Sequence, residues 1–128
     1  MWKRRVKTTR RALGDRKALG DRGERIAERL LRRAGLIVLA RNWRGGGGEL
    51  DRVALDGDTV VFIEVKTRTA GFEDDGRVPV SYAQRLRTRR AARAFRRRYG
   101  VTHLALRFDL VTVSGSRAAW EKDYYRAP

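Results

Sequence analysis

The sequence predicts a single mixed α/β domain in which helices and strands follow the order α-β-β-β-α-β. Two segments repeat apolar residues at helical spacing, and four shorter segments are rich in β-branched and aromatic residues. The length of 128 residues suits one hydrophobic core. We therefore expect a flexible basic arm over residues 1–20 and a single domain over residues 21–128.

The first helix is expected to begin after Asp21, a good N-cap residue, and to end at Gly35, which readily adopts the left-handed conformation. Glu24 has two interpretations. It completes a capping box with Asp21, or it reaches the sheet from beside the apolar face and orients a metal ion or a water molecule. That apolar face consists of Ile26, Ala27, Leu30, Leu31 and Ala34.

Three strands are expected next, at residues 36–43, 49–55 and 60–68. The four glycines at 45–48 are interpreted as a flexible connector between the first two strands. The Asp-Gly-Asp sequence at 56–58 is typical of a hairpin turn between the second and third strands.

A loop is expected at residues 69–79, because Gly and Pro interrupt any regular element there. A second helix follows from Ser81 to about Tyr99 and ends at Gly100. Gln84 either completes a capping box with Ser81 or points its amide toward the sheet. The inward stripe of this helix consists of Thr88, Ala91, Ala92, Phe95 and Tyr99.

A fourth strand is expected at residues 103–113. We interpret His103, within that strand, as a structural residue rather than a ligand. The aromatic tail at residues 120–125 either adds an edge strand or packs on the core.

The composition limits the classes of function. The chain has 31 Lys and Arg against 15 Asp and Glu, a formal net charge of +16, which favours a polyanionic partner over a merely solubilising surface. Cysteine is absent, which excludes disulfides, thiolate metal sites and cysteine nucleophiles. The apolar runs are too short to cross a bilayer, and none follows the basic N-terminus as in an export signal. We expect a cytoplasmic protein without membrane contact.

The arginines are concentrated in one part of the chain. Residues 76–108 contain ten arginines and no acidic residue. Nucleic acid, with DNA favoured, is the expected partner, because arginine binds phosphates and releases counterions. The expected nucleic-acid contacts are Arg68, Arg85, Arg87, Arg89, Arg90, Arg93, Arg96 and Arg97.

The hairpin turn decides which acidic residues meet across the second and third strands. A two-residue turn at 57–58 places Asp51 across from Glu64, and one at 56–57 places Glu49 across from Glu64. A three-residue turn would scatter the acidic residues. Either two-residue turn puts four residues on one face: Glu49, Asp51, Glu64 and Lys66.

Two opposed carboxylates repel each other unless a cation lies between them or one is protonated. Mg²⁺ or Mn²⁺, which prefer oxygen ligands, is therefore the expected cofactor. Lys66 would then hold a phosphate or orient and acidify an attacking water. The competing interpretation is an ordinary cross-strand Glu/Lys pair on an exposed face of the sheet.

The segment GERIAERLLRRAGLIVLARNWRGGGGELDRVALDGDTVVFIEVKTR resembles the YraN family of small, mostly bacterial proteins. The segment VSYAQRLRTRRAARAF resembles that family's following helix. The resemblance covers residues 20–95 well and residues up to 113 loosely. That family is similar in motif and predicted fold to the PD-(D/E)xK nucleases, which share the restriction-endonuclease-like fold with Holliday-junction resolvases.

The resemblance implies a role for each motif residue. Asp51 and Glu64 would be the two metal-binding acids, and Val65 would offer its backbone carbonyl to the metal ion. Lys66 would be the motif's lysine, and Glu24 matches the family's acid on the first helix.

Two positions depart from the family's pattern. The family usually has lysine where this chain has Gln84, which removes a charge that contacts phosphate. It usually has an aliphatic residue where Arg52 stands, and we expect this difference to affect packing.

The combined prediction is a divalent-metal-dependent endonuclease that hydrolyses phosphodiester bonds in DNA. We expect structured or branched DNA and little sequence specificity, because phosphate contacts carry little base information. Glu49 and Gln84 are expected to support the site or contact phosphate, and a homodimer is compatible with the sequence. Two alternatives stay open, a non-catalytic nucleic-acid-binding protein on a nuclease-like scaffold and a protein that docks on an acidic partner.

Overall fold

The computed structural model describes residues 2–68 and 80–126, with side chains described from residue 17 onward. The elements follow the order α-β-β-β-α-β-β, which confirms the predicted class and order and adds one strand at the end. The predicted loop at 69–79 lies outside the described residues. The elements are α1 (Trp2–Arg33), β1 (Ile37–Gly45), β2 (Gly48–Asp56), β3 (Thr59–Arg68), α2 (Tyr82–Tyr99), β4 (Ala105–Ser114) and β5 (Arg117–Glu121).

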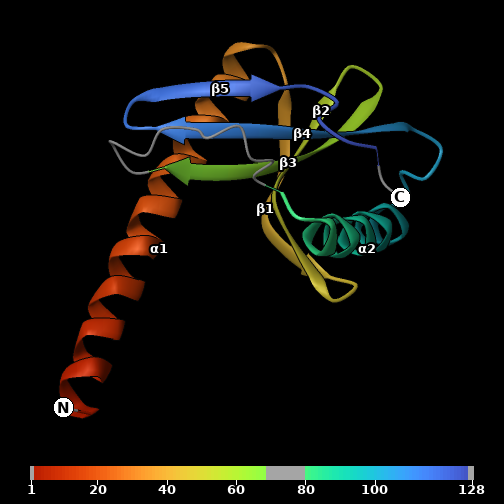
Figure 1. Ribbon diagram of the computed structural model, residues 1–128. Coiled ribbons are helices and arrows are strands. Elements are labelled where there is room, and N and C mark those ends of the chain that lie inside the picture. Colours follow the sequence, from red (N-terminus) through yellow and green to blue (C-terminus); the bar gives the residue numbers. More distant parts are fainter. Residues whose placement is uncertain (1, 69–79, 127–128) are drawn as a thin grey trace.

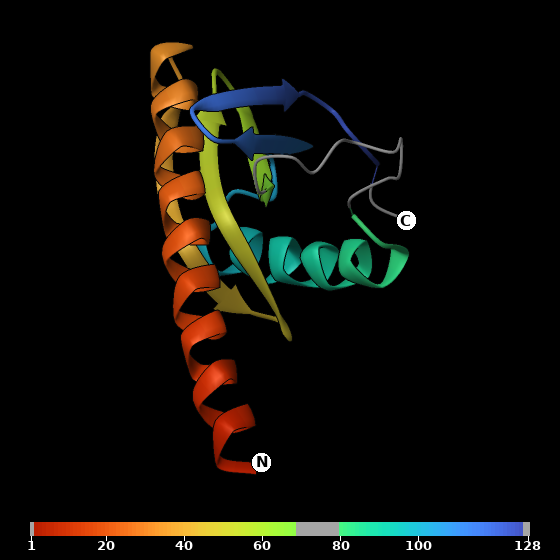
Figure 2. The ribbon, with the colours of Figure 1, turned by 60° about the vertical axis from the view of Figure 1, so that its left-hand side comes forward.

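The five strands form one mixed sheet in the order β1-β2-β3-β4-β5. Neighbouring strands are antiparallel, except that β3 and β4 are parallel. A parallel pair needs a crossover connection, and the segment that contains α2 provides it. The helices α1 and α2 cover opposite faces of the sheet (Figure 1, Figure 2).

Each helix packs on its own apolar cluster. Under α1, Ala27 and Leu31 are fully buried against strand residues that include Val61 and Val111. Under α2, a second cluster includes Ala91, Ala92, Phe95, Leu50, Val53, Phe62, Phe108, Leu110 and Tyr125. The sheet is therefore buried on both faces.

The first helix is longer than predicted. It starts at Trp2, so the predicted start after Asp21 is wrong, and residues 2–20 form its first part. This part extends away from the sheet (Figure 1, Figure 2). The flexibility expected of residues 1–20 stays a prediction. The predicted end is confirmed, because Gly35 has a φ of 90° and the N–H of Leu36 donates to the carbonyl of Leu31 at 3.1 Å.

The four glycines are not a flexible connector, and that prediction is wrong. Gly45 pairs with Gly48 across a two-residue turn, in which Gly46 and Gly47 have φ values of 60° and 82°. The turn lies against α2. A Cβ atom on Gly48 would come within 2.4 Å of the carbonyl oxygen of Arg87. The glycines are therefore required for close backbone packing as well as for the turn.

We expect Gly48→Ala to destabilise the protein by about 1–3 kcal/mol, because the added methyl group forces α2 and β2 apart. Gly20→Ala is the matched control, since a Cβ at this position of α1 meets nothing within 4 Å. It should stabilise by about 1 kcal/mol, the difference between Ala and Gly in a helix. Denaturant-induced unfolding measures both changes. Equal effects of the two substitutions would contradict the packing argument.

The second helix matches the prediction closely. The Ser81 side chain caps it by accepting a hydrogen bond from the N–H of Gln84, and Gly100 ends it with a φ of 67°. Thr88, Ala91, Ala92 and Phe95 of the predicted inward stripe are buried. Tyr99 is 53% exposed, so its assignment to the stripe is wrong.

Both predictions for the aromatic tail are confirmed in part. Trp120 lies in the edge strand β5 and pairs with Val111. Tyr125 packs on the core and stacks on Phe108 with ring centroids 5.1 Å apart. His103 precedes β4 and is exposed, so its assignment to the strand is wrong. In the described ranges, neither helix has the length and apolar character needed to span a membrane.

Candidate functional site

The register between β2 and β3 agrees with one of the two predicted alternatives. Asp56 pairs with Thr59, so the turn residues are 57–58. Continued along the strands, this register leads to Asp51 opposite Glu64. The alternative turn at 56–57 is excluded.

The two strands diverge just before these acidic residues. Pairing between β2 and β3 ends at Arg52 and Ile63, because β2 continues along β1 while β3 continues along β4. Asp51 and Glu64 are the first residues beyond the last pair. The N–H of Val65 donates to Oδ2 of Asp51 at 2.9 Å, in place of a bond to the neighbouring strand. Asp51 and Glu64 therefore lie where β2 and β3 diverge, and we call this place the fork of the sheet.

The two carboxyl groups at the fork interact directly. Burial, and then the charge of Glu64, raise the pKa of Asp51 to about 7, against the lowering effect of the Val65 N–H. Burial also raises the pKa of Glu64, while Lys66 and hydrogen bonds from Gln84 and Asp51 oppose the shift. A hydrogen bond between two carboxyl groups requires that one of them carries a proton. Without a cation, burial and mutual repulsion therefore disfavour the state in which both carboxyl groups are ionised.

Lys66 and Gln84 complete a polar cluster around Glu64. The ammonium nitrogen of Lys66 lies 3.3 Å from Oε1 of Glu64 and donates to Oε1 of Gln84 at 3.1 Å. Gln84 donates from Nε2 to the same Glu64 oxygen at 2.5 Å. The side-chain amide of Gln84 therefore points into the site, while its backbone N–H donates to the Ser81 hydroxyl group that caps α2. The amide fixes Lys66 beside Glu64.

Glu24 approaches the same fork from α1. It lies well inside the helix, so its interpretation as part of a capping box is wrong. Asn42 donates to its Oε1 at 2.7 Å, and Nη1 of Arg52 lies 3.4 Å from that oxygen. Burial, and then the charge of Asp51, raise the pKa of Glu24. Glu24 is therefore close enough to Asp51 to affect it electrostatically, with Arg52 as its counter-ion.

Sequence reasoning missed the ionic network behind Glu24. Arg52 is 4% exposed, donates to Glu28 at 3.0 Å and donates to the carbonyl of Asp51 at 2.7 Å. Arg41 binds both oxygens of Glu28, and these hydrogen bonds lower the pKa of Glu28 to about 2. The i,i+4 spacing of Glu24 and Glu28 was the available signal. Arg52 thus fixes α1 to β2, in agreement with the expected effect on packing.

The donors at the fork suit a hard divalent cation. Asp51 and Glu64 provide carboxylate oxygens, and the carbonyl of Val65 points to the same side of β3 as its N–H, which binds Asp51. Such oxygen donors, completed by water, are what Mg²⁺ and Mn²⁺ prefer. No group of three or more His, Cys, Asp and Glu side chains converges within the described residues. The protein ligands would therefore be two carboxylates and one carbonyl.

A shallow groove lies beside the fork. It has a volume of about 530 Å³ and runs between the glycine turn and α2, where Arg44 and Arg87 line it. Glu49 also lines it, with Oε2 3.7 Å from Nε of Arg44. The register alone would place Glu49 across from Lys66, but the strands have already diverged there. Glu49 still raises the pKa of Asp51, so the groove adjoins the carboxylates.

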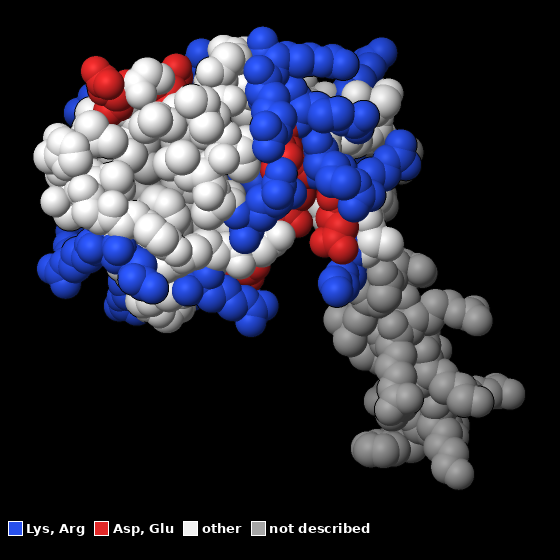
Figure 3. Space-filling view, turned by 180° about the vertical axis from the view of Figure 1, so that it is seen from behind, with Lys and Arg blue, Asp and Glu red and all other residues white. Residues whose placement is uncertain are grey.

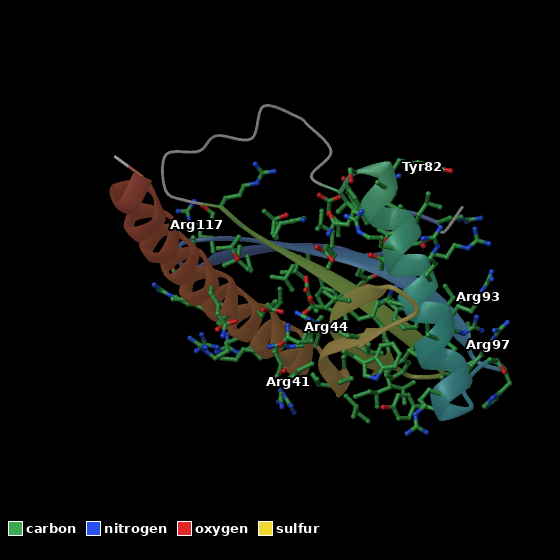
Figure 4. The ribbon with its side chains drawn as sticks, turned by 90° about the horizontal axis from the view of Figure 1, so that it is seen from below. Arg41, Arg44, Tyr82, Arg93, Arg97 and Arg117 are labelled. Carbon is green, nitrogen blue, oxygen red and sulfur yellow. The ribbon has the colours of Figure 1, made fainter. Side chains whose placement is uncertain are left out.

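The other arginines that were predicted to contact nucleic acid lie outside this groove. Arg85 lies over the rings of Tyr124 and Tyr125, and Arg68 ends β3. Arg93 and Arg97 are exposed on α2 and point outward (Figure 4). Arg90 is exposed, whereas Arg89 and Arg96 are partly buried. Lys and Arg side chains form dense groups on the surface, separated by an uncharged area (Figure 3). The structure therefore does not bring all predicted arginines to the fork.

Tyr125 is a further site neighbour that sequence reasoning missed. Its hydroxyl group bonds to Thr88 of the inward stripe, and burial raises its pKa to about 12, with a contribution from the charge of Glu64. The aromatic composition of the tail indicated packing but not this position. The tail therefore closes the core next to Glu64.

Fold and site together define a mixed α/β domain in which a buried carboxylate pair and a lysine lie where two strands of the sheet diverge. The chain belongs to the uncharacterised protein family UPF0102, whose profile matches residues 23–113. This confirms the family assignment made from the motif.

Individual relatives agree with this assignment. A UPF0102 protein of Nitratidesulfovibrio vulgaris strain DP4 is 46% identical over 92 residues, which is 72% of this chain and 69% of the relative. One of Burkholderia pseudomallei strain 1106a is 40% identical over 118 residues, 91% of this chain and 81% of the relative. One of Nocardia farcinica is 43% identical over 102 residues, 79% and 80% of the two chains.

Proposed function

We propose that this protein is a divalent-metal-dependent endonuclease that hydrolyses phosphodiester bonds in DNA. The observation that carries the proposal is the meeting of the Asp51 and Glu64 carboxyl groups at the fork, with the Val65 N–H on Asp51 and Lys66 beside Glu64, where burial raises the pKa of both acids. Two neighbouring carboxylates repel each other, which is unfavourable for folding unless a cation lies between them. Mg²⁺ or Mn²⁺, when bound by these residues and the carbonyl of Val65, would neutralise them and polarise a phosphoryl oxygen.

Lys66 provides the positive charge next to the reacting phosphate. Its side chain is 31% exposed, so the ammonium group is accessible, yet Glu64 and Gln84 hold it in place. A fixed ammonium group stabilises negative charge as it develops on an attacking water or on the phosphate. Gln84 acts as a positioning residue, because it binds Lys66 and Glu64 together.

The groove beside the fork supports the choice of substrate. Arg44 and Arg87 line it together with glycine backbone and Glu49, which lies two residues before Asp51 on β2. Guanidinium groups bind phosphates, and glycine allows a phosphate backbone to approach closely. We propose that the groove positions a DNA strand, structured or branched, with little sequence specificity, because these contacts read no bases.

The test is cleavage of flap, junction and single-stranded DNA with Mg²⁺ or Mn²⁺. We expect Lys66→Ala to lower the cleavage rate by about 10²-fold or more, because it removes a fixed charge next to the reacting group. Lys122→Ala is the matched control, since Lys122 is exposed and its ammonium group lies over the ring of Trp120. EDTA should abolish cleavage by the wild type. Equal rates for the wild type and Lys66→Ala on every substrate would refute the catalytic role.

A second candidate is a non-catalytic nucleic-acid-binding protein on the same scaffold. Its support is Gln84, a neutral residue where the family resemblance leads us to expect lysine. This candidate predicts tight, salt-sensitive binding of nucleic acid that EDTA does not change, with no cleavage by the wild type. The same set of DNA substrates therefore separates the two candidates.

A further inference from the structure

A pocket of about 540 Å³ lies between α2, the start of β4 and the C-terminal tail. The buried rings of Phe108 and Tyr125 contribute to its lining. Four arginines also line it, three on successive turns of α2 and one in the tail: Arg89, Arg93, Arg96 and Arg126. The volume lies within the range of small-molecule sites, about 300–1,000 Å³.

This pocket is separate from the fork. Arg93 follows Gln84 by nine residues, about 2.5 turns of a helix with 3.6 residues per turn, so the two point to opposite sides of α2. Gln84 faces β3, whereas Arg93 lines the pocket next to β4. The pocket therefore shares no residue with the proposed catalytic cluster.

The positive charge around the pocket is not balanced within the described residues. Arg89, Arg93 and Arg126 form no ion pair there, and Asp123 is the one acid in the lining. The fifth lining arginine, Arg107, does not add to the excess, because Asp109 and Asp56 bind it at 2.8 and 3.0 Å.

Arg96 adds a donor that has no acceptor. Its Nη2 donates to the carbonyls of Thr102 and Leu104, which fixes the guanidinium group against the turn that follows α2. Its Nε is buried and has no hydrogen-bond partner. Arg96 therefore keeps its positive charge at the pocket wall, held by backbone carbonyls and by no carboxylate of the described residues.

We propose that this pocket binds one phosphate-bearing nucleotide unit, with the arginines on the phosphate. Guanidinium groups bind phosphate through paired hydrogen bonds, and several unpaired ones around one cavity favour an anion strongly. The unit belongs to a nucleic-acid chain held at a second point behind α2. That source rests on the proposed function, whereas the preference for a phosphate does not.

The test compares two double variants that remove the same charge. Arg89→Gln with Arg93→Gln alters the pocket, whereas Arg98→Gln with Arg117→Gln alters exposed positions outside it. Binding of inorganic phosphate, adenosine monophosphate and a single-stranded oligonucleotide is measured in EDTA over a range of salt concentrations. We expect the pocket variant to bind the oligonucleotide about tenfold more weakly than the control variant, with a larger decrease in the salt slope.

Each outcome decides the proposal. Pocket-dependent binding of the oligonucleotide alone identifies a nucleic-acid chain, and pocket-dependent binding of the monophosphate identifies a free nucleotide as a source. If the monophosphate binds and the oligonucleotide does not, the pocket is a site for a free nucleotide and the proposed nucleic-acid source is wrong, while cleavage that depends on Lys66 tests the proposed function separately. The pocket proposal is wrong if the two variants lose binding affinity equally, or if the wild type binds none of the three probes. Cleavage that depends on Lys66 would then still support the proposed function.

Discussion

Replacing Asp51 by Asn is expected to stabilise the metal-free protein at neutral pH by a few kcal/mol. Burial and the charge of Glu64 raise the pKa of Asp51 from 3.8 to about 7 on folding, so the folded state disfavours the ionised carboxylate. Asn resembles the protonated acid, because it still accepts from the Val65 N–H and donates toward Glu64. The substitution therefore removes the unfavourable ionised form and leaves the hydrogen bonds in place.

The pH dependence of stability follows from the same shift. Between about pH 4 and about pH 7 the folded protein binds the Asp51 proton more tightly than the unfolded chain. The free energy of unfolding of the wild type should therefore decrease as the pH rises through this range and level off above it. For Asp51→Asn this decrease should be much smaller, and the advantage of the variant should disappear below about pH 4.

Asp58→Asn is the control for this prediction. It removes the same charge from the exposed β2–β3 turn and should change stability by no more than about 0.5 kcal/mol at any pH. Denaturant unfolding at several pH values in EDTA measures both variants. A wild-type stability that is flat across the range, or equal behaviour of the two variants, would show that the pair at the fork is not strained.

Metal binding should reverse the order of stability. Mg²⁺ or Mn²⁺ stabilises a protein that binds it only when folded, by an amount that grows with the ratio of metal concentration to dissociation constant. The wild type should gain stability at neutral pH, and Asp51→Asn should not, because one carboxylate ligand is lost. The site would then resemble other functional sites, which are unfavourable until the ligand is bound.

The meeting of the acidic residues could be predicted from the sequence because the hairpin is local. Either two-residue turn and the period of two along a strand put Asp51, Glu64 and Lys66 on one face, and the structure selected the turn that leads to Asp51 opposite Glu64. The family resemblance assigned roles to Lys66 and Glu24, which the residues alone had left open. The divergence of the strands could not be predicted, because it depends on how β1 and β4 pair with them.

Two predictions failed for different physical reasons. Asp21 is a good N-cap, but the helix continues back to Trp2, because a cap signal does not by itself end a helix. The four glycines have the composition of a linker, yet their small size is needed where α2 packs against the hairpin. For the glycines the local signal was compatible with a linker and with a tight turn, and tertiary packing selected the turn.

Asp109→Ala is expected to destabilise the protein by about 3–5 kcal/mol, since it removes one partner of a buried ion pair. Asp109 is fully buried and accepts hydrogen bonds from Arg107, the indole of Trp120 and the backbone N–H of Asp123. Without this carboxylate, three groups from β4, β5 and the tail lose their acceptor.

The effect of Asp109→Ala should extend to the candidate site. Asp123 shortly precedes Tyr125, whose ring stacks on Phe108 and whose hydroxyl group bonds to Thr88. If the tail is released from Asp109, the core behind Glu64 should therefore become exposed. We expect altered tryptophan fluorescence from Trp120 together with the loss of stability. Glu121→Ala, an exposed acid on β5, should change stability by no more than about 0.5 kcal/mol. If Asp109→Ala changed stability as little as Glu121→Ala, the Asp109 carboxylate would not hold the tail. The position of Tyr125 beside the site would then need another cause.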